Sequence, residues 1–206
     1  MPVSKEVLRN LTFANQLTFL RLVLIPFFII SILTNRPALA LALFLGAAVT
    51  DAFDGLIARY LKQTTALGAF LDPAADKLML TAAFVVLTIP DHPKALPDYT
   101  AANHVPVWLT ILTISRDTFI VLTAIILYFS FGIRRFPPTA LGKFTTFAEV
   151  VTILLFLLYN AWEEPGIPVI VASWTTLALI IVSGIHYIYR CGSMIREAGG
   201  AAPTQP

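Results

Sequence analysis

Six long apolar stretches alternate with short polar breaks along the chain. Each stretch is close to the ~20 residues that an α-helix needs to cross the hydrocarbon core of a bilayer. The breaks carry turn-forming or charged residues, such as Asn35-Arg36-Pro37 and Glu163-Glu164-Pro165-Gly166. The pattern therefore predicts an all-α integral membrane protein with six transmembrane helices. The stretches cover residues 16–34, 37–58, 66–89, 106–131, 139–160 and 168–189.

The two ends of the chain differ from this pattern. Four apolar residues near the start share one side of a helix, which predicts a short N-terminal surface helix over residues 3–11. Residues 191–206 are rich in Gly, Ala, Pro and Gln, and we expect them to form a disordered tail. We therefore expect a single six-span domain over residues 1–190. The four apolar residues are Val3, Val7, Leu8 and Leu11.

Composition supports a membrane location. Of the 206 residues, 57% are apolar and 13% are charged, and the mean hydropathy is +0.79. Soluble domains average about 25% charged residues. These values exclude a soluble globular protein, a disordered chain and a nucleic-acid-binding protein. The single cysteine, Cys191, excludes an internal disulfide and a multi-cysteine metal site.

The basic residues predict the orientation of the helices. Lys and Arg accumulate on the cytoplasmic side of membrane proteins. We therefore expect a multi-pass protein of the cell (inner) membrane with both termini in the cytoplasm. Arg21, in the first stretch, is interpreted as a helix-end residue whose guanidinium reaches the membrane surface. The cytoplasmic side then carries Lys5, Arg9, Arg59, Lys62, Arg134, Arg135, Lys143, Arg190 and Arg196, and the outer side carries Arg36 and Lys94.

Four carboxylates lie within the predicted spans. Asp51 and Asp54 are three residues apart in the second stretch, and Asp72 and Asp76 are four apart in the third. On a helix, these spacings place each pair on one side, near the cytoplasmic end. Carboxylates in a low-dielectric setting remain ionised together only with cations nearby, which predicts Mg²⁺ or Mn²⁺, as two ions. The alternative is a set of salt bridges with Lys77, Arg59 and Arg116.

Eight positions around these carboxylates carry a resemblance to a known family. They are Asp51, Asp54, Gly55, Ala58, Arg59, Gly68, Asp72 and Asp76. Their spacing resembles the complete signature of the CDP-alcohol phosphatidyltransferases. The start of the first stretch, from Asn15 to Arg21, also resembles the opening of the first span in this family. Members transfer a phosphatidyl or related group from a CDP-linked donor to an acceptor hydroxyl and release CMP.

The resemblance implies a role for each position. The four Asp residues would hold two divalent ions on the cytoplasmic side, and Asp76 would also be the general base. CDP-diacylglycerol would be the donor, and a homodimer is a further expectation. Nucleotide and donor binding is implied for Gly55, Ala58, Arg59, Gly68, Asn15 and Thr18.

The acceptor depends on finer resemblances. Leu71 to Lys77 resembles the branch that contains phosphatidylglycerophosphate synthases and cardiolipin synthases. Glycerol 3-phosphate is the acceptor we expect, and phosphatidylglycerol is the alternative. Ser115-Arg116-Asp117 resembles the cardiolipin synthases more closely, and Glu149 stands where relatives often have Gln. Cations that could bind an acceptor phosphate are Lys77, Arg116, Lys143, Arg134 and Arg135.

Two alternatives stay open. The cations at 134, 135 and 143 could instead be cytoplasmic anchors of the helices. The carboxylates could form the cation site of a transporter rather than of an enzyme. Against a transporter stand the position of the carboxylates near one face and the lack of an internal sequence repeat.

Overall fold

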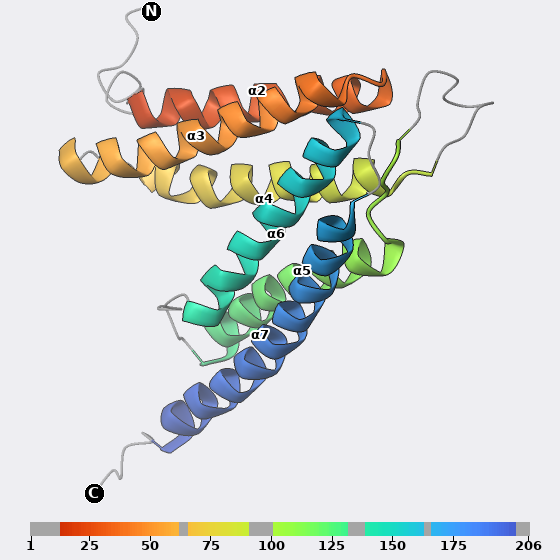
Figure 1. Ribbon diagram of the computed structural model, residues 1–206. Coiled ribbons are helices and arrows are strands. Elements are labelled where there is room, and N and C mark those ends of the chain that lie inside the picture. The colour runs from red at the N-terminus through yellow and green to blue at the C-terminus, as the bar shows by residue number, and fades with distance from the viewer. Residues whose placement is uncertain (1–12, 62–65, 91–100, 132–138, 163–165, 201–206) are drawn as a thin grey trace, which may run out of the picture. The chain divides into compact units, whose positions relative to one another are not determined.

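The computed structural model describes residues 13–61, 66–90, 101–131, 139–162 and 166–200, with side chains for 19–50, 75–90, 101–130, 139–162 and 166–196. Within these residues the secondary structure is six α-helices and no strand, which confirms the all-α prediction. Helices α2 to α6 begin and end close to the predicted boundaries. The six helices are α2 (Phe13–Leu33), α3 (Pro37–Leu61), α4 (Ala66–Thr88), α5 (Val107–Phe131), α6 (Ala140–Ala161) and α7 (Ile167–Gly200) (Figure 1).

Helix α7 extends beyond the end that the sequence predicted. It continues past Arg190, through a segment that includes Ser193, Arg196 and Glu197, to Gly200 and is 34 residues long. The helix is longer than the apolar run because backbone hydrogen bonds continue wherever the residues tolerate a helix, whether or not they are apolar. The predicted N-terminal surface helix at residues 3–11 lies outside the described residues.

Three helical segments are long and apolar enough to cross a membrane: Val107–Ser130, Ala140–Ala161 and Ile167–Arg196. Two shorter apolar segments, Phe19–Leu33 and Pro37–Thr50, lie in α2 and α3. The chain is therefore a membrane protein. The full count of six spans stays a prediction.

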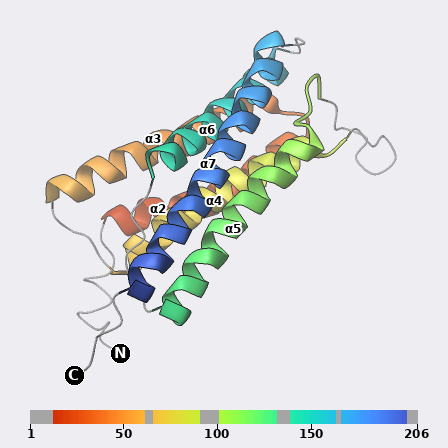
Figure 2. The same cartoon turned by 90° about the horizontal axis from the view of Figure 1, so that it is seen from below.

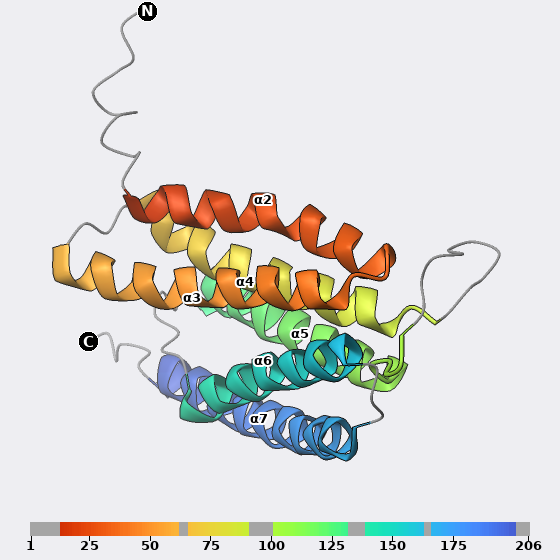
Figure 3. The ribbon, with the colours of Figure 1, turned by 45° about the horizontal axis from the view of Figure 1, so that its top comes forward.

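The chain forms two compact units, and the first combines residues 1–105 with 153–169. In it, α2 packs along both α3 and α4. Figures 1 and 3 show α3 running in the opposite direction to α2 and α4. Aromatic side chains fill the contact between α2 and α3, where the rings of Phe28 and Phe44 lie 5.9 Å apart and both are buried.

A tight turn reverses the chain between α2 and α3. Asn35 has a positive φ of 53°, a conformation that Asn tolerates better than most residues. Its N–H donates to the carbonyl of Ile32 at 3.0 Å, and the N–H of Arg36 donates to the carbonyl of Ser31 at 2.8 Å. This pair of bonds is the Schellman motif, which satisfies the last carbonyls of a helix. Pro37 then begins α3, where its missing N–H costs no helical hydrogen bond.

The second unit combines residues 106–152 with 170–206. In it α5 and α7 lie side by side (Figure 2). The rings of Trp108 and Trp174 are 5.4 Å apart near the start of both helices. Further along both helices, the rings of Phe119 and Tyr187 are 6.3 Å apart. These two contacts advance together, so α5 and α7 run parallel.

Helix α6 packs on α7 in the opposite direction. The hydroxyl groups of Thr152 and Thr176 are 2.8 Å apart. The hydroxyl of Thr145, two turns earlier in α6, donates at 3.4 Å to the carbonyl of Leu179, which is later in α7. Both threonines of α6 are buried. The interface is therefore made by small polar groups, which allow close approach of helices in a membrane.

Candidate active site

The four motif carboxylates belong to two consecutive helices of the first unit. Asp51 and Asp54 lie in α3, and Asp72 and Asp76 lie in α4. Because the backbone is helical through both segments, each pair has the spacing that places it on one side of its helix. The side chains of Asp51, Asp54 and Asp72 lie outside the described ones, so the shared site stays a prediction.

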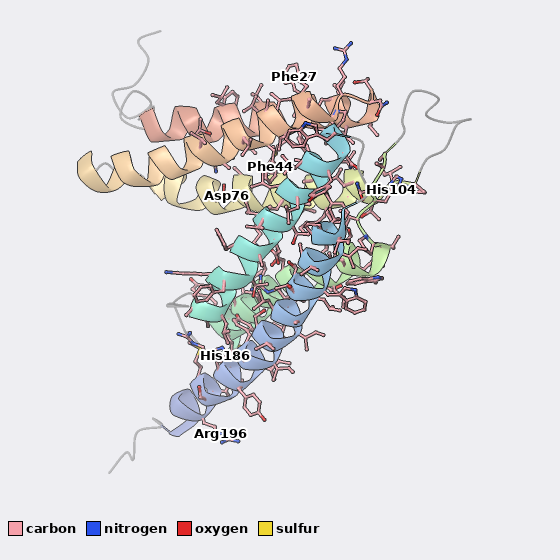
Figure 4. All side chains as sticks on the ribbon, viewed as in Figure 1. Phe27, Phe44, Asp76, His104, His186 and Arg196 are labelled. Atoms are coloured by element: carbon pink, nitrogen blue, oxygen red, sulfur yellow. The ribbon has the colours of Figure 1, made fainter. Side chains whose placement is uncertain are left out.

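Asp76 is paired with a buried arginine. Nη1 of Arg21, in α2, donates a hydrogen bond to Oδ1 of Asp76, which is labelled on α4 in Figure 4. The Arg21 side chain is 3% exposed and that of Asp76 is 42% exposed. The interpretation of Arg21 as a residue that reaches the membrane surface was therefore wrong. Its place inside a predicted span was the signal, since an ionisable residue there usually faces the protein interior and a partner.

The other predicted donor and acceptor residues are distributed over both units. Lys77 is partly buried beside Asp76, and Lys143 is exposed near the start of α6. Asn15, Thr18, Gly55, Ala58, Arg59 and Gly68 have a helical backbone, but their surroundings lie outside the described side chains. Arg134 and Arg135 lie outside the described residues altogether.

Arg116 is buried within the second unit between two carboxylates. Its Nη1 donates to Oδ1 of Asp117, the next residue of α5, at 2.7 Å. The same Nη1 lies 4.0 Å from Oε1 of Glu149 in α6. The side chain of Arg116 is 8% exposed, that of Asp117 is 18% exposed, and that of Glu149 is fully buried. The sequence identified Arg116 as a candidate residue, but it did not predict that the side chain of Glu149 lies beside it.

The start of α6 lies close to the guanidinium of Arg116. Thr139 caps the helix, because its hydroxyl accepts a hydrogen bond from the N–H of Gly142 at 2.9 Å. A Cβ placed on Gly142 would lie 3.6 Å from Nη2 of Arg116. That distance is an ordinary van der Waals contact, and the atom that a side chain at position 142 would crowd is Oγ1 of Thr139, at 2.9 Å.

Within the described part of the chain, the hydrogen bond that Arg116 donates to Asp117 uses Nη1 and leaves the buried Nε without a partner. Nε and Nη2 together form the side edge of a guanidinium, and two parallel N–H groups on one edge match the oxygens of a carboxylate or a phosphate. The geometry therefore suits an anionic ligand at this edge.

The donor set of the motif fits a hard divalent cation. All four candidate ligands are carboxylates, and oxygen ligands are preferred by Mg²⁺ and Mn²⁺. Among the side chains that the structure describes, no three His, Cys, Asp or Glu residues come together. Asp76 alone of the four motif side chains belongs to that part of the chain. Its partly exposed carboxylate is accessible to a ligand.

A match to a family model identifies the class of protein. Residues 11–185 match the family described as CDP-alcohol phosphatidyltransferase. The match covers most of the chain and includes the motif carboxylates of α3 and α4 together with Arg116 and Glu149. The chain belongs to the CDP-alcohol phosphatidyltransferase family, and it is an enzyme.

Individual relatives are similar over three quarters or more of this chain. A Mycobacterium tuberculosis protein named "probable phosphatidylglycerophosphate synthase" is 31% identical over 93% of this chain and 85% of its own. A CDP-diacylglycerol–glycerol-3-phosphate 3-phosphatidyltransferase of Bacillus subtilis is 32% identical over 84% of this chain and 91% of its own. A Mycobacterium bovis protein named "putative cardiolipin synthase" is 36% identical over 76% of this chain and 70% of its own.

Proposed function

We propose that this enzyme transfers the phosphatidyl group of CDP-diacylglycerol to glycerol 3-phosphate and releases CMP. The observation that supports this acceptor is the similarity, over most of both chains, to one relative named for glycerol 3-phosphate and one named phosphatidylglycerophosphate synthase. The buried Arg116, with its open Nε–Nη2 edge, supports an acceptor that bears a phosphate. The reaction makes a phospholipid precursor, which agrees with an enzyme whose helices lie in the bilayer.

The motif carboxylates would hold two divalent cations, Mg²⁺ or Mn²⁺. Asp51, Asp54, Asp72 and Asp76 are the proposed ligands, and Gly55, Ala58, Arg59, Gly68, Asn15 and Thr18 are proposed to contact the CDP part of the donor. Bound cations would neutralise the pyrophosphate of the donor and so favour departure of CMP.

Asp76 is the proposed general base. The acceptor hydroxyl gives its proton to the Asp76 carboxylate as its oxygen bonds to the phosphorus that carries diacylglycerol. The bond between that phosphorus and the oxygen of the CMP phosphate breaks, and CMP leaves with the electron pair. Arg21 would orient the carboxylate through Oδ1, since its guanidinium is buried and donates to that oxygen.

Arg116 is proposed to bind the phosphate of glycerol 3-phosphate. Its Nη1 is already held by Asp117, so the Nε–Nη2 edge would make the two parallel hydrogen bonds. Lys77, Lys143, Arg134 and Arg135 would add positive charge near the acceptor. These residues would make the chain selective for an acceptor with a phosphate over inositol or serine.

The membrane arrangement completes the proposal. Six spans with both termini in the cytoplasm would place the motif end of α3 and α4 on the cytoplasmic side, where CTP-derived donors and soluble acceptors are found. A homodimer remains part of the proposal on the basis of the resemblance alone.

Cardiolipin synthase is the second candidate function. The Mycobacterium bovis relative is 36% identical, and Ser115-Arg116-Asp117 resembles that group. The acceptor would then be phosphatidylglycerol, whose phosphate is a diester with one negative charge instead of two.

An acceptor panel tests the proposal. Purified protein in detergent micelles would receive CDP-diacylglycerol, Mg²⁺ and one acceptor at a time: glycerol 3-phosphate, phosphatidylglycerol, inositol phosphate or serine. We expect CMP release with glycerol 3-phosphate. Release with phosphatidylglycerol alone would make the enzyme a cardiolipin synthase. If the protein conducted cations in proteoliposomes and released no CMP under any condition, the proposed transferase reaction would be contradicted and a transporter would be favoured.

A further inference from the structure

We propose that Glu149 is a positioning residue that orients Arg116 for the acceptor phosphate. The inference rests on the proposed role of Arg116 in acceptor binding and names the residue on a neighbouring helix that makes this role possible. Glu149 would not touch the acceptor. It would act on the guanidinium from the side opposite to the Nε–Nη2 edge.

The position of Glu149 is the first support. Its side chain is fully buried, and Oε1 lies 4.0 Å from Nη1 of Arg116. Asp117 approaches the same nitrogen at 2.7 Å from α5. Carboxylates from two different helices therefore converge on one nitrogen of the guanidinium. Attraction from α6 restrains the rotation that a single partner on α5 would permit.

The cost of Glu149 is the second support. A carboxylate in the interior of a membrane helix opposes insertion by several kcal/mol on translocon scales. An apolar residue of similar volume would pack in the same place without this cost. The carboxylate of Glu149 in the middle of α6, beside an arginine of α5, therefore fits a functional role better than a packing role.

The third support is the geometry on the other side of the guanidinium. Gly142 lies one helical repeat of seven residues before Glu149, and a Cβ there would lie 3.6 Å from Nη2. Helix α6 thus lies near Arg116 at two places: the carboxylate of Glu149 is near Nη1, and the Gly142 position is at ordinary contact distance from Nη2. Both carboxylates approach Nη1, so neither of these two contacts uses the Nε–Nη2 edge.

Variants of Glu149 test this positioning role. Glu149→Leu keeps the volume and removes both oxygens, while Asp117 remains to pair with Arg116. We expect the acceptor KM to rise about tenfold, with kcat and the donor KM within about twofold. Inhibition by inorganic phosphate, competing with glycerol 3-phosphate, should weaken by a similar factor. The thermal midpoint in detergent should stay equal or rise, because a buried ionisable group has been removed.

Two controls separate positioning from structure. Glu149→Gln keeps an oxygen at the same distance but removes the charge, so it should raise the acceptor KM by less than Glu149→Leu does. Thr152→Val removes a buried polar group one turn along α6 and should lower the thermal midpoint without changing the acceptor KM. A Glu149→Leu effect of equal size on kcat, both KM values and stability would overturn the proposal. A lower acceptor KM would also overturn it, since Glu149 would then merely repel the phosphate.

Combining the Glu149 variant with a variant of Arg116 distinguishes failure of this inference from failure of the proposed function. Arg116→Lys keeps the positive charge for both carboxylates but removes the planar edge, so the acceptor KM should rise. Glu149→Leu in that background should add no more than about twofold. If Arg116→Lys leaves the acceptor KM unchanged, the acceptor role of Arg116 is wrong and the inference falls with it. If Arg116→Lys raises it and Glu149→Leu does not, the inference alone is wrong.

Discussion

At the scale of single residues, the buried charges of this protein occur with opposite charges beside them. Arg21 pairs with Asp76 in the first unit, and Arg116 lies beside Asp117 and Glu149 in the second. Desolvation of a lone charge in a membrane-spanning helix is costly, and a partner offsets part of that cost. Each pair therefore indicates a place where charge is retained for a purpose other than packing.

Asp76 carries the sharpest prediction at this scale. Asp76→Asn keeps the size and one oxygen ligand but removes the basic oxygen. Donor binding with metal should stay within about tenfold of the wild type, while CMP release falls by at least ~10²-fold, the usual contribution of a positioned base. Donor affinity and CMP release would be measured in one detergent.

Asp51→Asn and Asp54→Asn are the matched comparisons. These residues are proposed to hold metal only, so their loss should weaken donor binding together with turnover. If Asp76→Asn lost donor binding as severely as these two variants, Asp76 would be a ligand and not the base.

At the scale of helices, α7 buries small polar residues while several of its large apolar residues are exposed. In α7, Ser173, Thr176 and Ser183 are buried, whereas Trp174 and Ile185 are more than half exposed. Lipid tails are as apolar as these side chains, so burying them gives no hydrophobic gain. Close packing and hydrogen bonds between hydroxyl groups hold α6 to α7 instead.

The pair formed by Thr152 and Thr176 gives a prediction for this interface. Thr152→Val removes the 2.8 Å hydroxyl contact with little change in volume. We expect a loss of about 1 kcal/mol of stability, in the range measured for such bonds in membrane proteins. Thermal unfolding in detergent is the measurement.

Thr175→Val is the matched control. Thr175 is exposed, and its hydroxyl donates to the carbonyl of Val171 within its own helix. Its substitution should leave the thermal midpoint unchanged. Equal losses from both variants would mean that local helix preference, and not the contact between helices, is responsible.

At the scale of the whole molecule, activity should depend on divalent cations. Every candidate ligand is a carboxylate. Without bound cations, the donor site would therefore hold four neighbouring negative charges. EDTA should abolish CMP release, and excess Mg²⁺ or Mn²⁺ should restore it. The magnesium complex of EDTA at the same concentration is the control. Full turnover in EDTA would contradict the metal site.

The orientation of the chain is a second prediction at this scale. The basic residues predict that Lys62, between α3 and α4, faces the cytoplasm. In a Cys191→Ser background, Lys62→Cys should react with a membrane-impermeant maleimide from the cytoplasmic side of oriented vesicles. A cysteine introduced at Lys94 should react from the other side. The reverse result would overturn the orientation.

The sequence by itself determined the helices and the class of enzyme. Apolar length and the breaks at Asn35-Arg36-Pro37 and Glu163-Glu164-Pro165-Gly166 placed helix boundaries, because backbone hydrogen bonding is local and lipid demands apolar residues. The spacing of the motif around Asp51 and Asp76 resembled the family to which the chain belongs. The end of α7 was not predictable in this way, since a helix can continue beyond the apolar run that suggests it.

Only the tertiary structure decided which charges meet. Arg21 and Asp76 are 55 residues apart in sequence, and Glu149 reaches Arg116 from another helix. Periodicity places a side chain on one face of its own helix, but it does not say which face of which neighbour lies opposite. That choice depends on how α2 packs on α4 and how α6 meets α5. The partner of Arg21 and the second carboxylate beside Arg116 therefore follow from packing, whereas Asp117 is the sequence neighbour of Arg116.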